Sequence, residues 1–475
     1  MTPERLGGLV NARVAVIGDV MVDEYLTGRV DRISPEAPVP VVRGVELKAV
    51  AGGAANVAAN VAALGALALL VGVVGAGGAA EVEALIAAKG RARGLLIEDA
   101  SRRTIRKMRV MSNRQQIVRL DHEDTHPLSG EIEAALIAAA GRAIADSDII
   151  VLSDYGKGLF GDRALAEIIG LAKAAGKPVV VDPKRPEFSA YRGADLVTPN
   201  RGELARASGL PVDTDAQAEA AARVAQAQFG GGLLLTRSEQ GMSYFPVEGP
   251  AIHAPTAARE VFDVSGAGDT AIATLAAALA AGFAMGEAIH LANHAAGVVV
   301  GKAGTATLSL RELIAAMEAP SGGGDLVSWE DARRLREAWA REGLSVGFAN
   351  GCFDILHPGH VALIAQAAAA CDRLIVALNS DASTRRLKGP TRPAQTQEAR
   401  ATVMGALKGV AAVVIFDEDT PKALIEALQP DLLVKGADYR IEDVVGADVV
   451  QARGGRVLLV ETLAGHSTTR LLAAR

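Results

Sequence analysis

Two short stretches of this 475-residue chain combine residue types that could handle phosphate. The stretch NGCFDILHPGH, residues 350–360, places His357 and His360 three residues apart, although the chain has only eight histidines. That spacing suits a metal site, a phosphate site or an ordinary turn, so the surrounding sequence has to decide. The stretch DVSGAGDT carries three small residues directly before an acid: Gly266, Ala267, Gly268 and Asp269.

The segment around Asp269 is a candidate phosphate site. Gly266–Gly268 opens a long alanine-rich stretch predicted to be helical, so several backbone N–H groups would converge near the positive end of the helix dipole. That position can stabilise charge on a phosphoryl group, and Asp269 could accept a proton from an attacking hydroxyl. Aspartate also favours a helix start for capping alone, so both interpretations stay open for this stretch by itself.

Three other stretches could contribute to the same site. The glycine pair Gly52–Gly53 in AGGAANVA permits close backbone approach and is followed by Asn56. In TPNRGE, Asn200 and Glu203 stand at i and i+3 of a predicted helix start, where they could hold a hydrated Mg²⁺ or a phosphate. A helix of small residues around Asn293, followed by a glycine-rich turn, leaves room for adenine.

Together these motifs resemble the ribokinase-like carbohydrate kinases of the PfkB family. The resemblance covers residues 1–320 and depends on GDVMVDEY, GGAANVA, TPNRGE, LLTRSEQG and DVSGAGDT in that order. It implies ATP-dependent phosphorylation of a sugar, with Asp269 as catalytic base and Gly266–Gly268 as anion hole. It also implies that the sugar is bound by Asp23, Gly52, Gly53 and Asn56. It implies that the nucleotide or Mg²⁺ is bound by Asn200, Arg201, Gly202, Glu203, Thr236 and Asn293.

The two histidines precede an alanine-rich helix in the last third of the chain. Pro358 suits the first turn of a helix, and imidazoles at a helix start can donate hydrogen bonds to a phosphate as charge builds on it. Zinc is disfavoured because no convincing cluster of further Cys, His or acidic ligands stands nearby. The remaining candidate triphosphate ligands are basic or hydroxyl-bearing: Lys388, Arg392, Arg400, Ser467, Thr468, Thr469 and Arg470.

This second set resembles the HxGH nucleotidyltransferases, in their cytidylyltransferase-like branch, over about residues 347–470. The resemblance implies a Rossmann-like sheet and in-line attack of a substrate phosphate on the α-phosphorus of a nucleoside triphosphate, without a covalent enzyme intermediate. His357 and His360 would stabilise the pentacovalent centre. Lys388, Arg392 and the segment Ser467–Arg470 would bind the leaving phosphates.

The order of the two halves, with SPEAPVPVV after the first strand, resembles a family of bifunctional heptose kinase–adenylyltransferases. The resemblance implies phosphorylation of D-glycero-β-D-manno-heptose 7-phosphate at C1, then adenylyl transfer from ATP to heptose 1-phosphate, giving ADP-heptose. ATP would be co-substrate in both halves, with Mg²⁺ as the metal. A 7-phosphorylated sugar calls for a cationic clamp, for which the candidates are Arg102, Arg103, Arg106, Lys107 and Lys184.

Two alternatives to this function stay open. The substrate could be another sugar phosphate, or the chain could be a non-catalytic sugar sensor on a ribokinase scaffold. An NAD-dependent oxidoreductase is disfavoured, because the glycines at 75 and 77, followed by Ala80, form an incomplete dinucleotide fingerprint.

An α/β fold is expected to position these residues. Strand-like apolar runs, such as 14–18, 149–152 and 179–182, alternate with alanine-rich helices, the pattern of a parallel sheet with helices on both faces. Residues 27–50 break this pattern with prolines and alternating valines, which predicts a small antiparallel β flap. The resemblance implies that this flap could clasp a second copy in a homodimer.

Domain boundaries follow from one glycine-rich stretch. SGGGD, at 321–325, predicts a flexible linker. We therefore expect a kinase domain over 1–320, a linker and connecting helix over 321–343, and a nucleotidyltransferase domain over 344–475.

The composition excludes several classes of partner. A net charge of −6 argues against nucleic acid and against anionic membranes. Two cysteines and the absence of a signal-peptide pattern favour the cytoplasm. Residues 57–80 are uncharged and long enough to span a bilayer, but they divide into a helix-like and a strand-like part, so we predict a helix and a buried strand.

Overall fold

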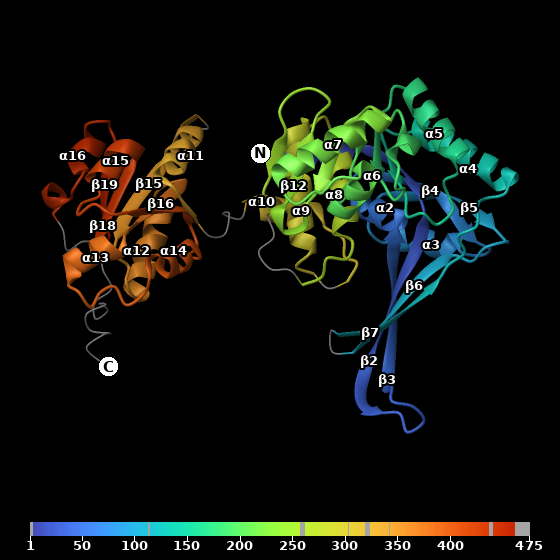
Figure 1. Ribbon diagram of the computed structural model, residues 1–475, viewed down its shortest axis with the longest axis horizontal. Coiled ribbons are helices and arrows are strands. Elements are labelled where there is room, and N and C mark those ends of the chain that lie inside the picture. The colour runs from blue at the N-terminus through green and yellow to red at the C-terminus, as the bar shows by residue number, and fades with distance from the viewer. Residues whose placement is uncertain are drawn as a thin grey trace. The chain divides into compact units, whose positions relative to one another are not determined.

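The computed structural model describes residues 3–112, 115–256, 262–302, 304–318, 324–341, 343–436 and 440–460. It divides into two compact units, Met1–Met317 with two sheets and Glu318–Arg475 with one, and each unit has its own core (Figure 1). The predicted α/β class is confirmed in both units. The segment Ser467–Arg470 and the glycines of the predicted linker at 322 and 323 lie outside the described residues.

The first unit is built on a mostly parallel sheet. Its strand order is β13-β12-β11-β10-β9-β8-β1-β4-β5, and only β12 and β13 pair antiparallel. Within the described residues the strands are β1 (Arg13–Gly18), β4 (Leu67–Gly75), β5 (Ala92–Asp99), β8 (Ile149–Ser153), β9 (Val179–Asp182), β10 (Leu196–Val197), β11 (Gly232–Thr236), β12 (Met242–Phe245) and β13 (Ile252–Ala254).

Helices cover both faces of this sheet, because successive side chains of a buried strand point to opposite faces. On β1, Val14 and Val16 join one hydrophobic cluster, whereas Ala15 and Ile17 join the other. The helices are α1 (Pro3–Gly7), α2 (Ala54–Ala63), α3 (Ala79–Ala87), α4 (Gly130–Ala145), α5 (Asp162–Ala174), α6 (Arg201–Ser208), α7 (Asp215–Phe229), α8 (Ala267–Ala280), α9 (Met285–Val299) and α10 (Leu310–Glu318), with short 3-10 turns at Gly8–Asn11, Phe188–Tyr191 and Ser238–Gln240.

The uncharged segment 57–80 forms most of α2 and then β4, so the prediction of a helix and a buried strand is confirmed. Among the residues that the structure describes, no helix is both long and apolar enough to cross a membrane.

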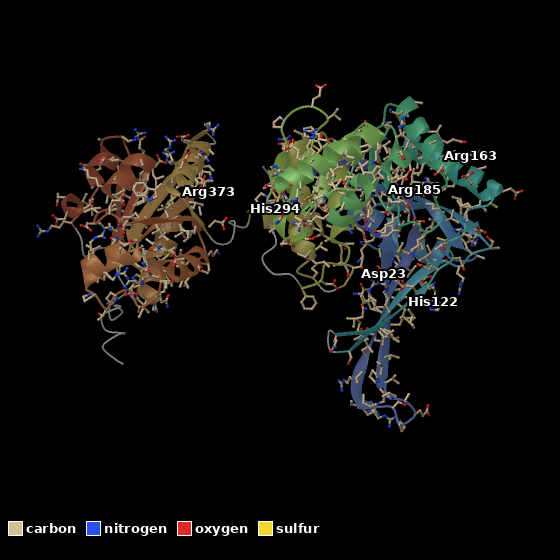
Figure 2. All side chains as sticks on the ribbon, viewed as in Figure 1. Asp23, His122, Arg163, Arg185, His294 and Arg373 are labelled. Atoms are coloured by element: carbon tan, nitrogen blue, oxygen red, sulfur yellow. The ribbon has the colours of Figure 1, made fainter. Side chains whose placement is uncertain are left out.

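A second sheet projects from the first unit and is called the flap below (Figure 1). Its strand order is β3-β2-β6-β7, formed by β2 (Val20–Ile33), β3 (Pro40–Gly53), β6 (Ile105–Ser112) and β7 (Gln115–His122). The antiparallel pair predicted over 27–50 is present as β2 and β3. The flap is larger than predicted and is a mixed sheet, because β6 pairs parallel with β2 and β7 pairs antiparallel with β6. Figure 2 shows Asp23 near the base of the flap, where β2 leaves the rest of the unit.

The second unit has a parallel sheet of order β14-β17-β16-β15-β18-β19. Its strands are β14 (Asp325–Val327), β15 (Val346–Gly351), β16 (Arg373–Asn379), β17 (Val410–Phe416), β18 (Leu432–Gly436) and β19 (Arg456–Val460). Its helices are α11 (Trp329–Arg341), α12 (Pro358–Ala369), α13 (Asp381–Lys388), α14 (Gln397–Gly405), α15 (Lys422–Leu428) and α16 (Ala447–Gln451), with a 3-10 turn at Ile441–Asp443.

The stretch predicted as linker and connecting helix belongs largely to this second unit. β14 pairs with β17, and Trp329 at the start of α11 packs on the core that contains Phe348. On the other face of the sheet, Ala349 joins the cluster that includes residues of α12 and α14.

Candidate functional sites

The first candidate site centres on Asp269, in the first turn of α8. Its side chain is 8% exposed, and both carboxylate oxygens accept hydrogen bonds. The Tyr155 hydroxyl donates to Oδ1, and Asn56 Nδ2 donates to Oδ2 over 2.6 Å. Burial raises the pKa of Asp269 to about 6, and the two hydrogen bonds act against burial because they stabilise the charged form. A carboxylate with such a pKa is suited to act as a general base near neutral pH.

The backbone before Asp269 needs glycine at one position. Gly266 caps α8 with φ of 78°, in the left-handed region that side chains with a Cβ rarely adopt. A Cβ at this position would also lie 3.0 Å from Asn56 Nδ2. The small residues of the motif therefore place the start of α8 against the amide that binds the carboxylate.

Beside Asp269, the structure brings together the residues predicted for the sugar. A Cβ on Gly52 would lie 2.9 Å from Asp23 Oδ2, and one on Gly53 would lie 2.6 Å from the carbonyl oxygen of Asp19, so both positions require close backbone approach. Asp23 accepts from Arg109 over 2.7 Å and from the Thr305 hydroxyl over 3.0 Å. Asp23 also raises the pKa of Asp269, which places its negative charge near the base.

On the other side of Asp269 lies a cavity of about 440 Å³. Asn200, Thr236, Ala267, Gly268 and Asn293, which the sequence assigned to the nucleotide or the anion hole, all line it. Asn200 and Glu203 form a capping box at the start of α6: each side chain accepts from the backbone N–H of the other, over 2.9 and 3.0 Å.

The predicted pair Arg201 and Gly202 is placed differently. Arg201 donates to the carbonyl oxygen of Arg237 over 3.1 Å and lies 3.4 Å from a Glu239 oxygen. Gly202 sits in the first turn of α6. Neither is among the described residues that line the cavity.

Sequence reasoning missed Asp182, at the carboxyl end of β9. Asp182 and Glu203 line a small cavity of about 50 Å³ that shares Asn200, Thr236 and Gly268 with the larger one. Burial, and next the charges of Asp269 and Glu203, raise the pKa of Asp182 well above its usual value. Its position was available from the sequence, because ligands of parallel α/β sheets gather at the carboxyl ends of strands.

Three candidates for the cationic clamp are already paired with carboxylates of the same unit. Arg102 pairs with Asp99 over 3.0 Å, Arg103 with Asp124 over 3.1 Å, and Arg106 with Glu24 over 2.6 Å. Because side chains alternate along β6, Arg106 points to the opposite face of the flap from Lys107 and Arg109. The structure therefore does not bring Arg106 to the sugar side.

Lys184 also lies away from the sugar residues. Its Nζ is 3.4 Å from Glu203 Oε1, so the structure places Lys184 on the nucleotide side of Asp269. Its side chain is half exposed there.

Lys107, in contrast, does face the site. Its Cα pairs with that of Asp23 across β2 and β6, and its Nζ lies 5.6 Å from the centre of the Tyr155 ring. The described residues give its ammonium no ion pair. Burial lowers the pKa of Lys107, although the charge of Asp23 acts in the opposite direction. Arg109, two residues on, is held by Asp23.

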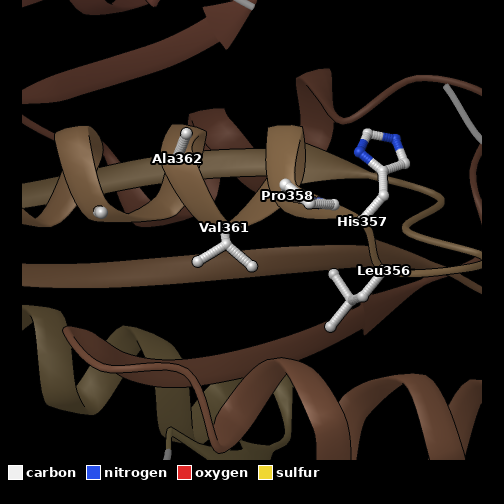
Figure 3. Close-up of a pocket in the computed structure, with 6 residues that line it drawn as sticks. Leu356, His357, Pro358, Val361 and Ala362 are labelled. Atoms are coloured by element: carbon white, nitrogen blue, oxygen red, sulfur yellow. The ribbon is translucent and has the colours of Figure 1, made fainter. Parts of the chain in front are cut away.

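The second candidate site lies at the start of α12. His357 caps this helix and Pro358 opens it, as predicted. The rings of His357 and His360 stack with centres 3.7 Å apart, and Phe353 meets the His360 ring edge-on at 5.0 Å. Both histidines line a cavity of about 540 Å³ that also contains Lys388. His357 also lines a neighbouring apolar pocket with Leu356 and Val361, and Figure 3 shows its ring pointing away from those two side chains.

The basic residues around this cavity have different roles. Lys388 lines the cavity. Arg392 is bound by the buried carboxylate of Asp354. Arg400 is 2% exposed and donates to the carbonyl oxygen of Cys352 over 2.6 Å and to Asp381 over 2.7 Å. Arg400 therefore holds the loop before the histidines in place. The prediction that Arg400 is a triphosphate ligand is wrong, because its side chain is buried and does not line the cavity.

Sequence reasoning missed Lys435, near the end of β18. Its Nζ donates to the carbonyl oxygen of Asn350 over 3.3 Å, and it lines the cavity with the histidines. Because β18 is the parallel neighbour of β15, the carboxyl ends of the two strands lie at the same edge of the sheet. That signal was available in the sequence pattern.

Comparisons with known proteins follow this division of the chain. The model of the pfkB family carbohydrate kinases matches residues 11–312, and that of the cytidylyltransferase-like family matches residues 348–470. "Bifunctional protein HldE" of Azorhizobium caulinodans is 57% identical over 97% of this chain and 98% of its own length. The proteins of the same name from Gluconobacter oxydans and Caulobacter vibrioides are 52% and 51% identical, each over 97% of this chain and over 97% and 96% of their own lengths.

Solved structures show a shared fold. Ribokinase of Arabidopsis thaliana, complexed with ribose and ATP, has a TM-score of 0.50 at 20% identity, over 65% of this chain and 99% of that one. Phosphofructokinase-2 of Escherichia coli, in complex with potassium, has a TM-score of 0.53 at 17% identity, over 64% and 96%.

We predict that His360 titrates well below neutral pH. Burial, and next the charges of His357 and Lys388, lower its pKa to about 4 from an ordinary value of 6.5. Nitrogen-15 NMR of labelled histidine should therefore show a neutral His360 ring at neutral pH. The variant His357→Ala removes one of these charges, so the midpoint should move upward. A midpoint at the ordinary value in the native protein would contradict this account of the stacked pair.

Proposed function

This chain belongs to the family of bifunctional HldE proteins, and we propose that it carries out two steps of ADP-heptose biosynthesis. The first unit phosphorylates D-glycero-β-D-manno-heptose 7-phosphate at C1 with ATP. The second transfers AMP from ATP to heptose 1-phosphate and releases pyrophosphate. Between the two steps, a separate phosphatase removes the 7-phosphate. The observation that carries the kinase step is the buried Asp269 carboxylate. It accepts a hydrogen bond from Asn56, one of the predicted sugar residues, and directly follows Gly268, which lines the cavity beside α8.

In the kinase step, the C1 hydroxyl of the sugar lies next to Asp269, with Asp23 and the backbone at Gly52–Gly53 binding other hydroxyls. ATP occupies the cavity lined by Asn200, Thr236 and Asn293. As the hydroxyl attacks the γ-phosphorus, its proton passes to Asp269. The backbone N–H groups at the start of α8 stabilise the charge on the phosphoryl group in transfer.

Mg²⁺ fits the nucleotide side of this site. The described residues contain no group of three or more His, Cys, Asp or Glu that could enclose a metal. Mg²⁺ commonly binds through one or two carboxylates, water and substrate phosphates, and Glu203 supplies such a carboxylate beside the cavity. When bound, the ion neutralises charge on the phosphates of ATP. Its positive charge would also offset the negative charges of Asp269 and Glu203, which, after burial, raise the pKa of Asp182.

In the adenylyl-transfer step, a phosphate oxygen of heptose 1-phosphate attacks the α-phosphorus of ATP in the cavity beside α12. His357 and His360 donate hydrogen bonds to the phosphate oxygens as charge builds on them. Lys388, at the end of α13, and Lys435, on β18, both line the cavity and supply positive charge to the triphosphate. Ser467, Thr468, Thr469 and Arg470 stay predicted ligands of the leaving pyrophosphate.

The 7-phosphate of the sugar is assigned to Lys107 and Arg109. Both side chains lie on the same face of the flap as Asp23. Lys107 Nζ also lies close to the Tyr155 ring. A partly buried ammonium without an ion pair is unfavourable until an anion neutralises it, and a sugar phosphate provides that anion. This assignment replaces Arg106 and Lys184, which face Glu24 and Glu203.

The flap is assigned to a homodimer interface. Cross-strand neighbours put Leu26, Leu47, Met108 and Leu120 on one face, and Leu47 and Leu120 are 55% and 45% exposed. Asp23, Tyr25, Lys107 and Arg109 share the opposite face. Two exposed leucines, beside half-buried apolar neighbours on the same face, support contact with a second copy.

We predict that the two activities separate by mutation. Asp269→Asn should abolish phosphorylation of heptose 7-phosphate and leave adenylyl transfer to heptose 1-phosphate intact, because the amide cannot accept the proton. His360→Ala should do the reverse. Mass spectrometry of the products from each substrate with ATP measures both, and a panel of other sugar phosphates serves as the comparison. Loss of both activities from either change would contradict independent sites, and faster turnover of another sugar would replace heptose as substrate.

We predict that Lys107→Ala raises KM for heptose 7-phosphate by about tenfold or more, the usual effect of losing a charged hydrogen bond. Arg103→Ala is the matched control, because Arg103 comes from the same basic run but is exposed and paired with Asp124. Assays at about pH 8 keep Asp269 charged in all variants. An equal loss with heptose lacking the 7-phosphate would show that Lys107 does not recognise that phosphate.

We predict that Leu47→Glu converts the protein to a monomer, because a charge on the apolar face of the flap would be buried in the dimer. Lys48→Glu is the control, since Lys48 neighbours Leu47 on β3 but points to the other face. Light scattering after size exclusion gives the mass directly. A native protein with the mass of one chain would exclude the interface.

A further inference from the structure

The hydroxyl of Tyr155 has no part in the proposed phosphoryl transfer, yet it contacts the catalytic carboxylate. We infer that Tyr155 is a positioning residue that fixes the orientation of the Asp269 carboxylate and holds it in its charged form until the sugar delivers its proton. This inference rests on the proposed kinase function of the first unit. It concerns a residue that no sequence motif indicated.

The first support is the geometry around the carboxylate. Tyr155 and Asn56 donate to different oxygens of Asp269, so the plane of the carboxylate is fixed at both ends. The amide of Asn56 is itself oriented, because Asn60 Nδ2 donates to its Oδ1 over 3.1 Å. Asn60 in turn accepts from the Thr270 hydroxyl over 3.0 Å. Tyr155 is thus the second of two donors that hold the base.

The second support is the way the backbone around Tyr155 is held. Tyr155 follows β8, and its N–H donates to Asp19 Oδ2 over 2.8 Å. The N–H of Lys157 donates to the same oxygen over 3.2 Å, and that of Gly156 donates to Asp154 Oδ1 over 2.8 Å. Asp19 and Asp154 are 3% and 5% exposed. Two buried carboxylates therefore fix the loop that carries the phenol.

The third support is electrostatic. The charged or titratable groups that face Asp269 are Asp23 on β2, Lys107 on β6, Asp182 at the end of β9, and Tyr155. Burial, and next the charges of Asp269 and Asp182, raise the pKa of Tyr155 well above its ordinary value. The phenol therefore keeps its proton wherever the kinase works, and its hydroxyl remains a donor to the carboxylate.

The consequence has a definite sign. Asp269 acts only when unprotonated, so kinase activity falls as the pH drops through its pKa, which is about 6. Tyr155 stabilises the charged form, so removing its hydroxyl leaves a buried carboxylate with one donor fewer. The pKa of Asp269 must then rise. A residue that only filled space would leave this pKa unchanged.

The test is the pH profile of kcat/KM for heptose 7-phosphate with saturating ATP and Mg²⁺. Tyr155→Phe should move the acidic limb to higher pH by about one unit, the size expected from the loss of one hydrogen bond to a charged group. Tyr244→Phe is the control. It also removes a partly buried phenol hydroxyl, but Tyr244 lies on β12 and makes no hydrogen bond to Asp269 or to the aspartates that hold the loop after β8. Its acidic limb should coincide with that of the native protein.

A second variant gives the opposite sign and does not depend on the folding of Tyr155→Phe. Incorporation of 3-fluorotyrosine at position 155 makes the phenol more acidic and a stronger donor, so the acidic limb should move to lower pH. Thermal unfolding and the adenylyltransferase activity of each variant report on its folding. An acidic limb that stays at the native pH in the fluorotyrosine variant, or that moves upward, overturns the inference.

Failure of this inference can be distinguished from failure of the proposed function. If the native protein does not phosphorylate heptose 7-phosphate, the proposed function fails. If the native protein does so and neither variant moves the acidic limb, only the role of Tyr155 fails.

Discussion

The chemistry proposed for the first unit depends on keeping one carboxylate, that of Asp269, charged where burial makes charge unfavourable. A buried carboxylate without partners would take up a proton and lose its function as a base. Here two donors, Asn56 and Tyr155, oppose burial, and the pKa settles at about 6. The glycines around the site follow from the same constraint, because a Cβ at Gly266 would crowd the amide that binds the carboxylate. The helix start, the loop after β8 and the sugar side are thus arranged around one group.

The second unit meets a related constraint with groups of the opposite kind. His357 and His360 stack closely, and burial together with neighbouring positive charge lowers the pKa of His360 to about 4. His360 is therefore poorly suited to carry a positive charge while no anion lies beside it. A triphosphate would reverse the balance, since its negative charge favours protonated rings and strengthens their hydrogen bonds. Lys107 in the first unit follows the same logic. In both units, burial lowers the pKa of a basic group, and the negative charge of the proposed substrate would raise it again.

Helix starts could be predicted from the sequence, because short local patterns determine them. Contacts that depend on the register between distant strands could not. The helix starts at Gly266 and Pro358 follow from short-range signals, and both were located correctly. The partners of Asp269 were not, because Tyr155 lies in a loop more than one hundred residues earlier and no motif marks it. Within the basic run before residue 110, only the register of β6 decides that Arg106 faces a glutamate while Lys107 faces the site. Such choices depend on pairing between distant strands.

In the flap, the side chains on both faces of the sheet require one register of strand pairing. Side chains alternate along its strands, so a slip of one residue would exchange its two faces. One face carries Asp23 and Lys107 toward Asp269, and the other carries the apolar row that includes Leu47 and Leu120. A slip would place charge on the apolar face and leucine at the sugar. The proposed substrate recognition and the proposed contact with a second copy would therefore both depend on the same alternation of side chains along the flap.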